Sequence, residues 1–223
     1  RIRKAPGLVD PTRVCELLVG LGDVTVLGAD DEPGGPVRVH VETRSVRPSC
    51  PGCGGLVWSK DQRPVELVDL AAFGRPARLV WHKRRWSCPA PSCPVGSFTE
   101  TADRIAAARL VMTDRAGRWV TEQVGRYKRS VNEVAAELGC DWHTINDTVI
   151  AYGTPLVEHP ARIGDVEALG LDETLFARLG PWRTQNWSTS VVDVRRGQLL
   201  DVVEGRSSAG ACEWMAGRDQ VWL

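Results

Sequence analysis

Apolar and polar residues alternate along short segments of the first hundred positions, a pattern typical of strands that keep one face in solvent. Val37–Val41 alternates in this way, and Val24–Leu27 is a second strand-like run on the other side of a turn-rich segment. Val65–Leu70 and Ala77–Trp81 flank a Phe-Gly-Arg-Pro turn, so they predict a β-hairpin. The sequence therefore predicts an N-terminal β region, which follows a short helix over Thr12–Gly20.

The pattern becomes helical from Thr101 to about Tyr152, where apolar positions recur with a period near 3.6. Ser130 and Glu133 have the spacing of a capping box, in which two side chains satisfy exposed N–H groups at a helix start. Gly139 then follows as a turn residue, because glycine adopts a positive φ at no steric cost. Asp141 has the position of a cap for the next helix.

Three residues of this segment match the spacing of a helix-turn-helix unit. Ala135 lets two helices approach closely, Gly139 forms the turn and Ile145 anchors the second helix. The exposed N-terminal residues of such a second helix normally face the major groove of DNA. In this chain those residues are Trp142, His143, Thr144, Asn146 and Asp147. A plain helical hairpin is the alternative.

Beyond a linker expected at Pro155–Pro160 the pattern returns to β. Three strand-like runs and a final helical run are predicted, at Ala168–Phe176, Trp187–Val194, Gln198–Val203 and Ser207–Arg218. Asp172 and Glu173 lie within the first run, where a carboxylate is costly unless it is paired or bound to metal. A salt bridge to a nearby arginine and a metal-binding role both remain open for Asp172.

Length and composition are those of an ordinary soluble protein. The 223 residues, 43% of them hydrophobic and 25% charged, suffice for one large domain or two to three small ones. The longest charge-free stretch, Ser87–Thr99, is broken by proline and cysteine, so we expect no transmembrane helix. Arg1–Gly20 lacks the apolar core of a signal peptide, so we expect a cytoplasmic protein. Since the first residue is Arg rather than Met, we expect the natural start to lie upstream.

The balance of 28 basic and 28 acidic residues argues at first against a nucleic-acid partner, but it hides a gradient. Residues 38–129 hold 17 Lys and Arg against 8 Asp and Glu, whereas residues 152–223 hold 7 against 10. DNA-binding enzymes often separate phosphate contacts from metal-binding carboxylates in this way. A chance fluctuation on a solvated surface is the alternative.

Four of the seven cysteines form two short knuckles, which predict a structural zinc site. Cys50 and Cys53 form a CxxC turn, and Cys88 and Cys93 form a second knuckle with proline between the two cysteines. A disulfide framework is disfavoured by the odd number of cysteines, and a redox CxxC would not need the second pair. The other three, Cys15, Cys140 and Cys212, are interpreted as ordinary buried small residues.

A basic run lies between two tryptophans just before the second knuckle. Lys83, Arg84 and Arg85 can bind backbone phosphates, while Trp81 and Trp86 can stack on sugar or base. The alternative is that both tryptophans pack the small ribbon and the charges stay solvated, and the two interpretations are compatible. His82 is a less favoured zinc ligand, since four cysteines are present.

The order of these motifs resembles the insertion-sequence transposases of the ISL-three type. The resemblance rests on Cys50–Gly54, Lys83–Cys88, Phe98–Glu100, the helix-turn-helix pattern and Leu169–Glu173. It implies an N-terminal zinc ribbon, a helix-turn-helix and a ribonuclease-H-like DDE domain that cuts and rejoins DNA at the ends of the element. It also implies that Cys50, Cys53, Cys88 and Cys93 are zinc ligands.

The same resemblance implies that Asp172 is the first catalytic carboxylate. Strand transfer of this kind uses two Mg²⁺ ions held by two or three converging acidic side chains. The second and third acidic residues of the family are expected beyond Leu223, so we expect Asp172 alone to leave an incomplete magnesium site. Asp193 is interpreted as a hairpin residue rather than as the second carboxylate.

The sequence therefore predicts an α+β multidomain chain. We expect a β region with a four-cysteine zinc ribbon over residues 1–100, a helix-turn-helix over 101–153 and the start of a DDE domain over 154–223. The expected function is that of a transposase portion that binds the terminal inverted repeats of its element as a homo-oligomer, without cutting them. A zinc-ribbon and helix-turn-helix transcriptional regulator is the alternative.

Overall fold

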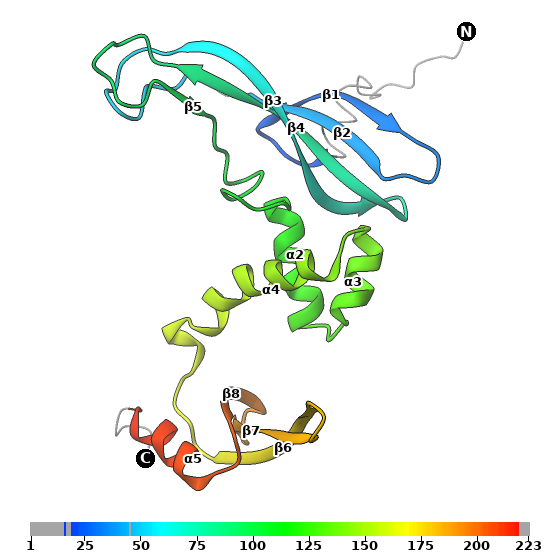
Figure 1. Cartoon of the computed structure of the whole chain (residues 1–223), viewed down its shortest axis with the longest axis vertical. Helices are drawn as coiled ribbons and strands as arrows, with labels where there is room; N and C mark the ends of the chain where they lie inside the picture. The colour runs from blue at the N-terminus through cyan, green and yellow to red at the C-terminus, as the bar shows by residue number, and fades with distance from the viewer. Residues whose placement is uncertain (1–15, 17–18, 45, 219–223) are drawn as a thin grey trace, which may run out of the picture. The chain divides into compact units, whose positions relative to one another are not determined.

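The computed structural model describes residue 16, residues 19–44 and residues 46–218. They form an α+β fold in two compact units, Arg1–Leu156 and Val157–Leu223 (Figure 1). The boundary between the units falls within the segment expected as a linker. The first unit holds both the β region and the helices, and their predicted division into separate domains stays a prediction. The helix expected over Thr12–Gly20 lies largely outside the described residues.

A five-stranded sheet forms most of the first unit. Its strands are β1 (Val24–Asp31), β2 (Val37–Thr43), β3 (Trp58–Ala72), β4 (Arg75–Ser87) and β5 (Ser97–Thr99). The order is β1-β2-β4-β3, and β5 also pairs with β4. β4 therefore lies at the centre, parallel to β2 and antiparallel to β3 and β5. The strands and the hairpin expected from the sequence are confirmed, and the strands are longer than expected.

Two prolines lie in the β3–β4 hairpin, one on an edge strand and one beside a shift in the strand register. Pro64 has no N–H to donate, and it is tolerated because β3 is an edge strand. The hairpin register shifts between Asp69 and Ala72, where the partner strand carries Pro76. This β-bulge decides which side chains of β3 and β4 lie opposite each other farther along the hairpin.

The sheet buries one continuous apolar core. Leu79 and Trp81 of β4 pack there with Val41, Leu67 and Ile105. Trp81 has only 1% of its surface exposed, so it is a core residue of the sheet rather than a part of the small ribbon.

Three helices follow the sheet, namely α2 (Asp114–Gly125), α3 (Val131–Leu138) and α4 (Trp142–Val157). The expectation of helix from Thr101 was wrong, because residues 101–113 form turns and short bridges. Ile105 and Ala106 are held there by packing against the sheet core, which a local apolar period does not reveal. The linker expected from Pro155 was also wrong at its start, since α4 continues through Pro155.

The capping residues predicted at the start of α3, at its end and at the start of α4 are confirmed. The Ser130 hydroxyl accepts the Glu133 N–H at 3.2 Å, and the Glu133 carboxylate accepts the Ser130 N–H at 2.9 Å. This contact lowers the pKa of Glu133. Gly139 has a left-handed φ of 60°, and Asp141 accepts the N–H of Thr144 at 2.9 Å. Ala135 of α3 and Ile145 of α4 belong to one buried cluster, so both helices pack into the same apolar core.

Buried and polar contacts join these helices to the sheet. Val68 of β3 packs in the same apolar cluster as Met112 and the faces of α2, α3 and α4. Asp69, which is 4% exposed, accepts hydrogen bonds from Thr113 at 2.7 Å and from Arg115 at 2.8 Å. Because the carboxylate is buried with its partners, this contact ties the start of α2 to β3.

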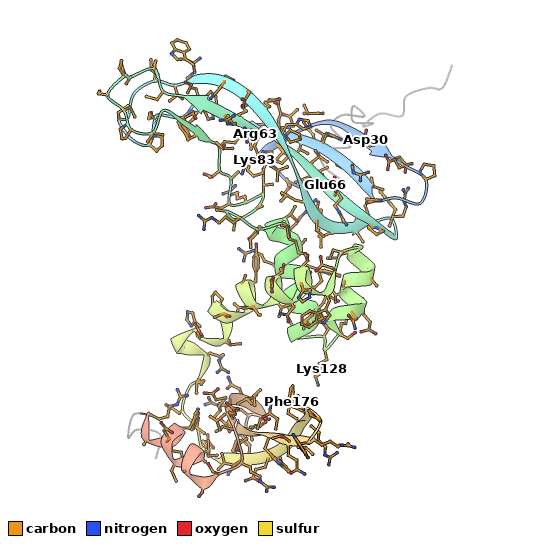
Figure 2. The ribbon with its side chains drawn as sticks, in the orientation of Figure 1. Asp30, Arg63, Glu66, Lys83, Lys128 and Phe176 are labelled. Atoms are coloured by element: carbon orange, nitrogen blue, oxygen red, sulfur yellow. The ribbon has the colours of Figure 1, made fainter. Side chains whose placement is uncertain are left out.

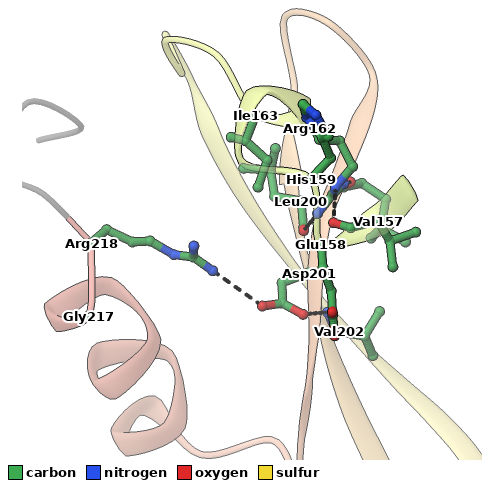
Figure 3. Close-up of a pocket in the computed structure, with 11 residues that line it drawn as sticks. Val157, Glu158, His159, Arg162, Ile163, Leu200, Asp201, Val202, Gly217 and Arg218 are labelled. Carbon is green, nitrogen blue, oxygen red and sulfur yellow. Dashed lines mark hydrogen bonds and ion pairs between the residues drawn. The ribbon is translucent and has the colours of Figure 1, made fainter. Parts of the chain in front are cut away.

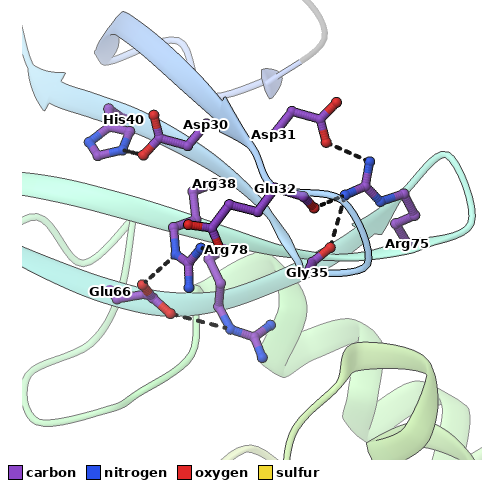
Figure 4. Close-up of polar contacts among 9 residues, drawn as sticks. All are labelled: Asp30, Asp31, Glu32, Gly35, Arg38, His40, Glu66, Arg75 and Arg78. Carbon is purple, nitrogen blue, oxygen red and sulfur yellow. Dashed lines mark hydrogen bonds and ion pairs between the residues drawn. The ribbon is translucent and has the colours of Figure 1, made fainter.

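Arg78 of β4 forms the second polar link. It donates to the carbonyls of Leu138 and Gly139 at 3.0 and 2.6 Å, which satisfies exposed acceptors at the end of α3. Glu66 lies between the guanidinium groups of Arg78 and Arg38 (Figure 4). The helices and the sheet of the first unit are therefore held by both apolar and charged contacts.

The second unit is a three-stranded antiparallel sheet with a short 3-10 helix before it and one helix after it. The elements are η1 (Pro160–Arg162), β6 (Leu169–Leu179), β7 (Thr184–Asp193), β8 (Gln198–Glu204) and α5 (Ser208–Ala216), in the sheet order β6-β7-β8. The predicted strands and helix are confirmed. Asp193 accepts the N–H groups of Arg195 and Arg196 in the β7–β8 turn, so its interpretation as a hairpin residue is also confirmed. No helix of the described residues is long and apolar enough to cross a membrane.

Substitution of Gly139 by alanine should destabilise the first unit. A Cβ there would lie 2.8 Å from the Pro76 ring, and the positive φ alone costs about 1–2 kcal/mol for a residue with a side chain. Gly125→Ala is the matched control, because nothing lies within 4 Å of its added Cβ and alanine favours helix. Urea unfolding should show a lower free energy for Gly139→Ala only, and equal values for the two variants would contradict this account.

Candidate functional site

The four cysteines of the two knuckles come together in the first unit. Cys50 and Cys53 lie in a tight loop closed by the Ser49–Leu56 bridge, just before β3. Cys88 follows directly after β4, and Cys93 lies in the loop that leads to β5. The sulfur atoms of all four lie within 4.8 Å of one another.

The geometry of this cluster fits zinc. The Cys50 and Cys93 Sγ atoms are 3.6 Å apart, and so are those of Cys53 and Cys88. A tetrahedral zinc ion with Zn–S bonds of about 2.3 Å requires sulfurs about 3.8 Å apart. Four thiolates are also the ligand set that structural zinc prefers. The cluster therefore fits the structural zinc of a zinc ribbon.

The backbone of the first knuckle prepares the site. The N–H of Gly52, followed by that of Cys53, lowers the pKa of Cys50 to about 7. The lack of a side chain at Gly52 is also required, since a Cβ would lie 2.6 Å from Val95 and 3.2 Å from the Cys93 sulfur. The CxxC spacing alone gives no sign of this role of Gly52 in sulfur packing.

The second knuckle shows why a cation is needed. The N–H of Ala90 favours the thiolate of Cys88, but burial and the neighbouring sulfurs outweigh it and raise the pKa of Cys88 to about 12. Four clustered sulfurs repel one another when ionised, and a bound divalent ion removes this conflict.

Apolar side chains cover the cysteine cluster. Val57 and Trp86 are buried beside Cys50 and Cys88, and Phe98 packs at the edge. Trp86 is 5% exposed and Trp81 is 1% exposed, so neither ring is available to a nucleotide. The interpretation of both as stacking residues was therefore wrong. Burial against two different cores decides the matter, and the spacing of the tryptophans gives no sign of it.

Cys140, Cys212 and His82 lie outside the cluster. Cys140 is half-buried, and burial raises its pKa. Cys212 is exposed, so its interpretation as a buried residue was wrong, while Cys15 lies outside the described residues. His82 lies 2.9 Å from His40 between ring nitrogens, and the other nitrogen of His40 contacts Asp30.

The basic run occupies β4 with its members on alternate faces. Arg84 pairs with Glu42 at 3.1 Å, and Arg85 pairs with Asp61 at 3.0 Å. The Lys83 ammonium lies 4.2 Å from the centre of the Trp81 ring. The two arginines must therefore exchange carboxylates for phosphates if they contact DNA.

Glu100 has a positioning role beside this run. Its carboxylate is 8% exposed and accepts the Arg84 N–H at 2.7 Å and the Thr43 hydroxyl at 2.6 Å. It thereby joins β2 to β4 next to the ribbon. In the sequence Glu100 was only the end of a family motif, because nothing local shows which strands it joins.

The first turn of α4 presents polar and aromatic groups. Trp142 is 43% exposed and meets the ring of exposed His143 edge to face. Thr144 donates its N–H and hydroxyl to Asp141, and Asn146 is half-buried. Trp142 and His143 are therefore accessible to solvent, and their role in DNA recognition stays a prediction.

Asp172 lies in β6 of the second unit, paired with Ser190 of β7. It is exposed, so its mid-strand position is not the costly burial that the sequence suggested. Its one hydrogen bond among the described residues comes from the Thr174 hydroxyl at 3.4 Å, and the predicted alternative of a salt bridge is not found among them. Within the described part of the chain, only the four cysteines form a metal-binding group of three or more ligands. The described residues therefore do not fit a two-magnesium site.

A cavity of about 820 Å³ lies elsewhere in the second unit (Figure 3). Arg162 donates to two carbonyls of β8 at 2.9 and 2.6 Å, and Asp201 pairs with Arg218 at 3.3 Å. Asp172 does not line it. The charged groups of its wall thus serve the packing of η1 and α5 against β8.

Residues 46–93 match the family model described as the zinc-finger of transposase IS204/IS1001/IS1096/IS1165. The matched segment contains all four clustered cysteines and the basic run. Comparison with curated proteins and with solved structures gives no match. The similarity thus concerns the zinc ribbon.

Purified protein should carry about one zinc ion per chain, and Gly52→Ala should release it faster to a chromogenic chelator. The physical reason is the clash of the new Cβ with Val95 and the Cys93 sulfur. Gly55→Ala is the control, since its Cβ would meet the Cys53 sulfur at an ordinary 3.4 Å. Metal analysis that finds no zinc in fresh protein would sink the assignment.

Proposed function

We propose that the chain is the DNA-binding N-terminal portion of an ISL-three-type transposase. The observation that carries this proposal is the family match over residues 46–93, which coincides with the cluster of four cysteines. A zinc ribbon of this kind gives a small β unit the stability that its few apolar residues cannot supply. Cys50, Cys53, Cys88 and Cys93 are its proposed zinc ligands.

The α3–α4 pair is the proposed sequence-reading element. Its capping box and left-handed glycine, and the burial of Ala135 and Ile145 in one cluster, support a helix-turn-helix. The proposed base contacts come from the first turn of α4, which such units insert into the major groove. They are Trp142, His143, Thr144 and Asn146.

The basic run of β4 is the proposed phosphate-contacting element. Lys83 is better placed than its neighbours, because Arg84 and Arg85 already hold Glu42 and Asp61. Both ion pairs are only partly covered, and surface ion pairs are worth about 0–1 kcal/mol, so phosphates can compete for both arginines. Phosphate contacts then position the protein, while the helix supplies the sequence preference.

The proposed partner is double-stranded DNA at the terminal inverted repeats of the element, bound by a homo-oligomer in the cytoplasm. These finer features rest on the resemblance described above. The proposed role of Asp172 as the first magnesium-binding carboxylate rests on it as well. Its position in the middle of β6, beside β7, agrees with that role.

A zinc-ribbon transcriptional regulator is the second candidate function. It is favoured by one observation, namely that Asp172 belongs to no group of three or more metal-ligating side chains among the described residues. Both functions require DNA binding, and they differ in whether the DNA is cut by the whole protein.

The chain should bind duplex DNA with an affinity that falls steeply with salt, because basic side chains displace condensed counterions. His143→Ala and Asn146→Ala should lose about 1–3 kcal/mol of preference for duplexes from the ends of the parent element. Their affinity for an unrelated duplex should change little, as fluorescence anisotropy can show. Trp182→Ala, at a position 90% exposed in the second unit, is the control. No binding to any duplex at low salt would contradict the proposed function.

Incubation of this 223-residue chain with Mg²⁺ and supercoiled plasmid should give no strand cleavage. One carboxylate cannot hold the two metal ions that such chemistry needs. Gel electrophoresis checks this result. Cleavage that disappears in Asp172→Ala would instead show that the chain completes its own magnesium site.

A further inference from the structure

Two basic side chains lie directly opposite each other in the β3–β4 hairpin. The antiparallel register pairs Arg63 of β3 with Lys83 of β4, so both project from the same face of the hairpin (Figure 2). Like charges at directly opposed positions destabilise a sheet, and stable hairpins normally place a carboxylate or a neutral residue there. The cationic pair, Arg63 and Lys83, therefore needs an explanation.

The neighbouring pairs on the same face show what ordinary pairing looks like. On one side Asp61 lies opposite Arg85 and accepts its hydrogen bond at 3.0 Å. On the other side Val65 lies opposite Trp81. Among the described residues neither Lys83 nor Arg63 has a carboxylate partner, and the nearby Asp61 is engaged by Arg85. The cationic pair thus carries two uncompensated charges.

The structure also holds one of the two charges in place. The Lys83 ammonium lies 4.2 Å from the centre of the Trp81 ring, and that ring is fixed in the sheet core at 1% exposure. Lys83 is half-buried, whereas Arg63 is exposed and extends from the edge strand. A fixed ammonium beside an accessible guanidinium offers an anion several donors at low entropic cost.

We propose that Arg63 and Lys83 form a phosphate-binding site that takes one backbone phosphate of DNA. Opposed Cβ atoms lie only about 5 Å apart, so one phosphate can accept from both side chains. Arginine suits this task through its planar fork of donors, and lysine supplies a compact charge. This inference rests on the proposed function and adds Arg63 to the residues expected from the sequence.

The repulsion between Arg63 and Lys83 destabilises the free protein. The effect of a substitution on the melting temperature therefore distinguishes a binding site from a structural feature. Removal of one charge relieves the repulsion in the hairpin, so Arg63→Gln should leave the melting temperature unchanged or higher. The same variant should weaken binding to a duplex of about 30 base pairs about fivefold, the upper value for an exposed ion pair. A residue with a merely structural role would instead lower the melting temperature.

The experiment compares the full chain with Arg63→Gln, Lys83→Gln and the double variant by anisotropy over a salt series. The log–log salt slope should become shallower by about 0.9 in the double variant, because the site neutralises one phosphate, and by less in each single variant. Arg104→Gln is the matched control, because its exposed guanidinium pairs with Asp23 and lies outside the basic run. It should change the salt slope less than the double variant does.

The outcomes separate this site from the proposed function. If the wild-type chain binds duplex and the double variant keeps the same affinity and slope, the site is wrong and DNA binding stands. If the wild-type chain binds no duplex, inorganic tripolyphosphate becomes the probe. Stabilisation of the wild-type chain but not of the double variant would then support a site for free phosphates, and stabilisation of neither would overturn it. A lower melting temperature for Arg63→Gln would also overturn it.

Discussion

The structure depends on the central position of β4. This strand pairs with β3 along one edge and with β2 and then β5 along the other. Its early residues Leu79 and Trp81 enter the sheet core, while Trp86 and Cys88 at its end enter the ribbon core. Arg78 reaches from it to the end of α3. One strand thus contributes to an apolar core, leads directly into Cys88 of the zinc site and contacts a helix, because alternating side chains serve opposite faces.

The part of the fold that local chemistry controls could be predicted from the sequence. Ser130 and Glu133 define a helix start, and Gly139 ends α3, because each acts on backbone groups within a few residues. The helix predicted from Thr101 does not form over residues 101–113, because Ile105 and Ala106 pack against a sheet that is distant in the sequence. Pro155 failed as a boundary because α4 continues through it to Val157, although a proline inside a helix removes one backbone hydrogen bond.

The candidate site could likewise be predicted from the sequence only where local spacing determines it. Spacing identified the four cysteines, since two knuckles with turn residues have few other uses. It did not identify Arg63, because the bulge near Pro76 shifts the hairpin register by one residue. Without that shift Arg84 would lie opposite Arg63, and every cross-strand pair beyond the bulge would change. Long-range burial likewise decided that Trp81 and Trp86 are core residues.

The contact between Arg78 and α3 has a geometric consequence for a bound duplex. Ten residues along β4 separate Arg78 from Cys88, a span of about 33 Å at the usual rise of a strand. One turn of B-form DNA is about 34 Å long. If a duplex bound as proposed above followed β4, it would turn the same face toward the end of α3 and toward the ribbon, one helical repeat apart. The length of this strand would then set the spacing between the two segments of that duplex that the first unit contacts.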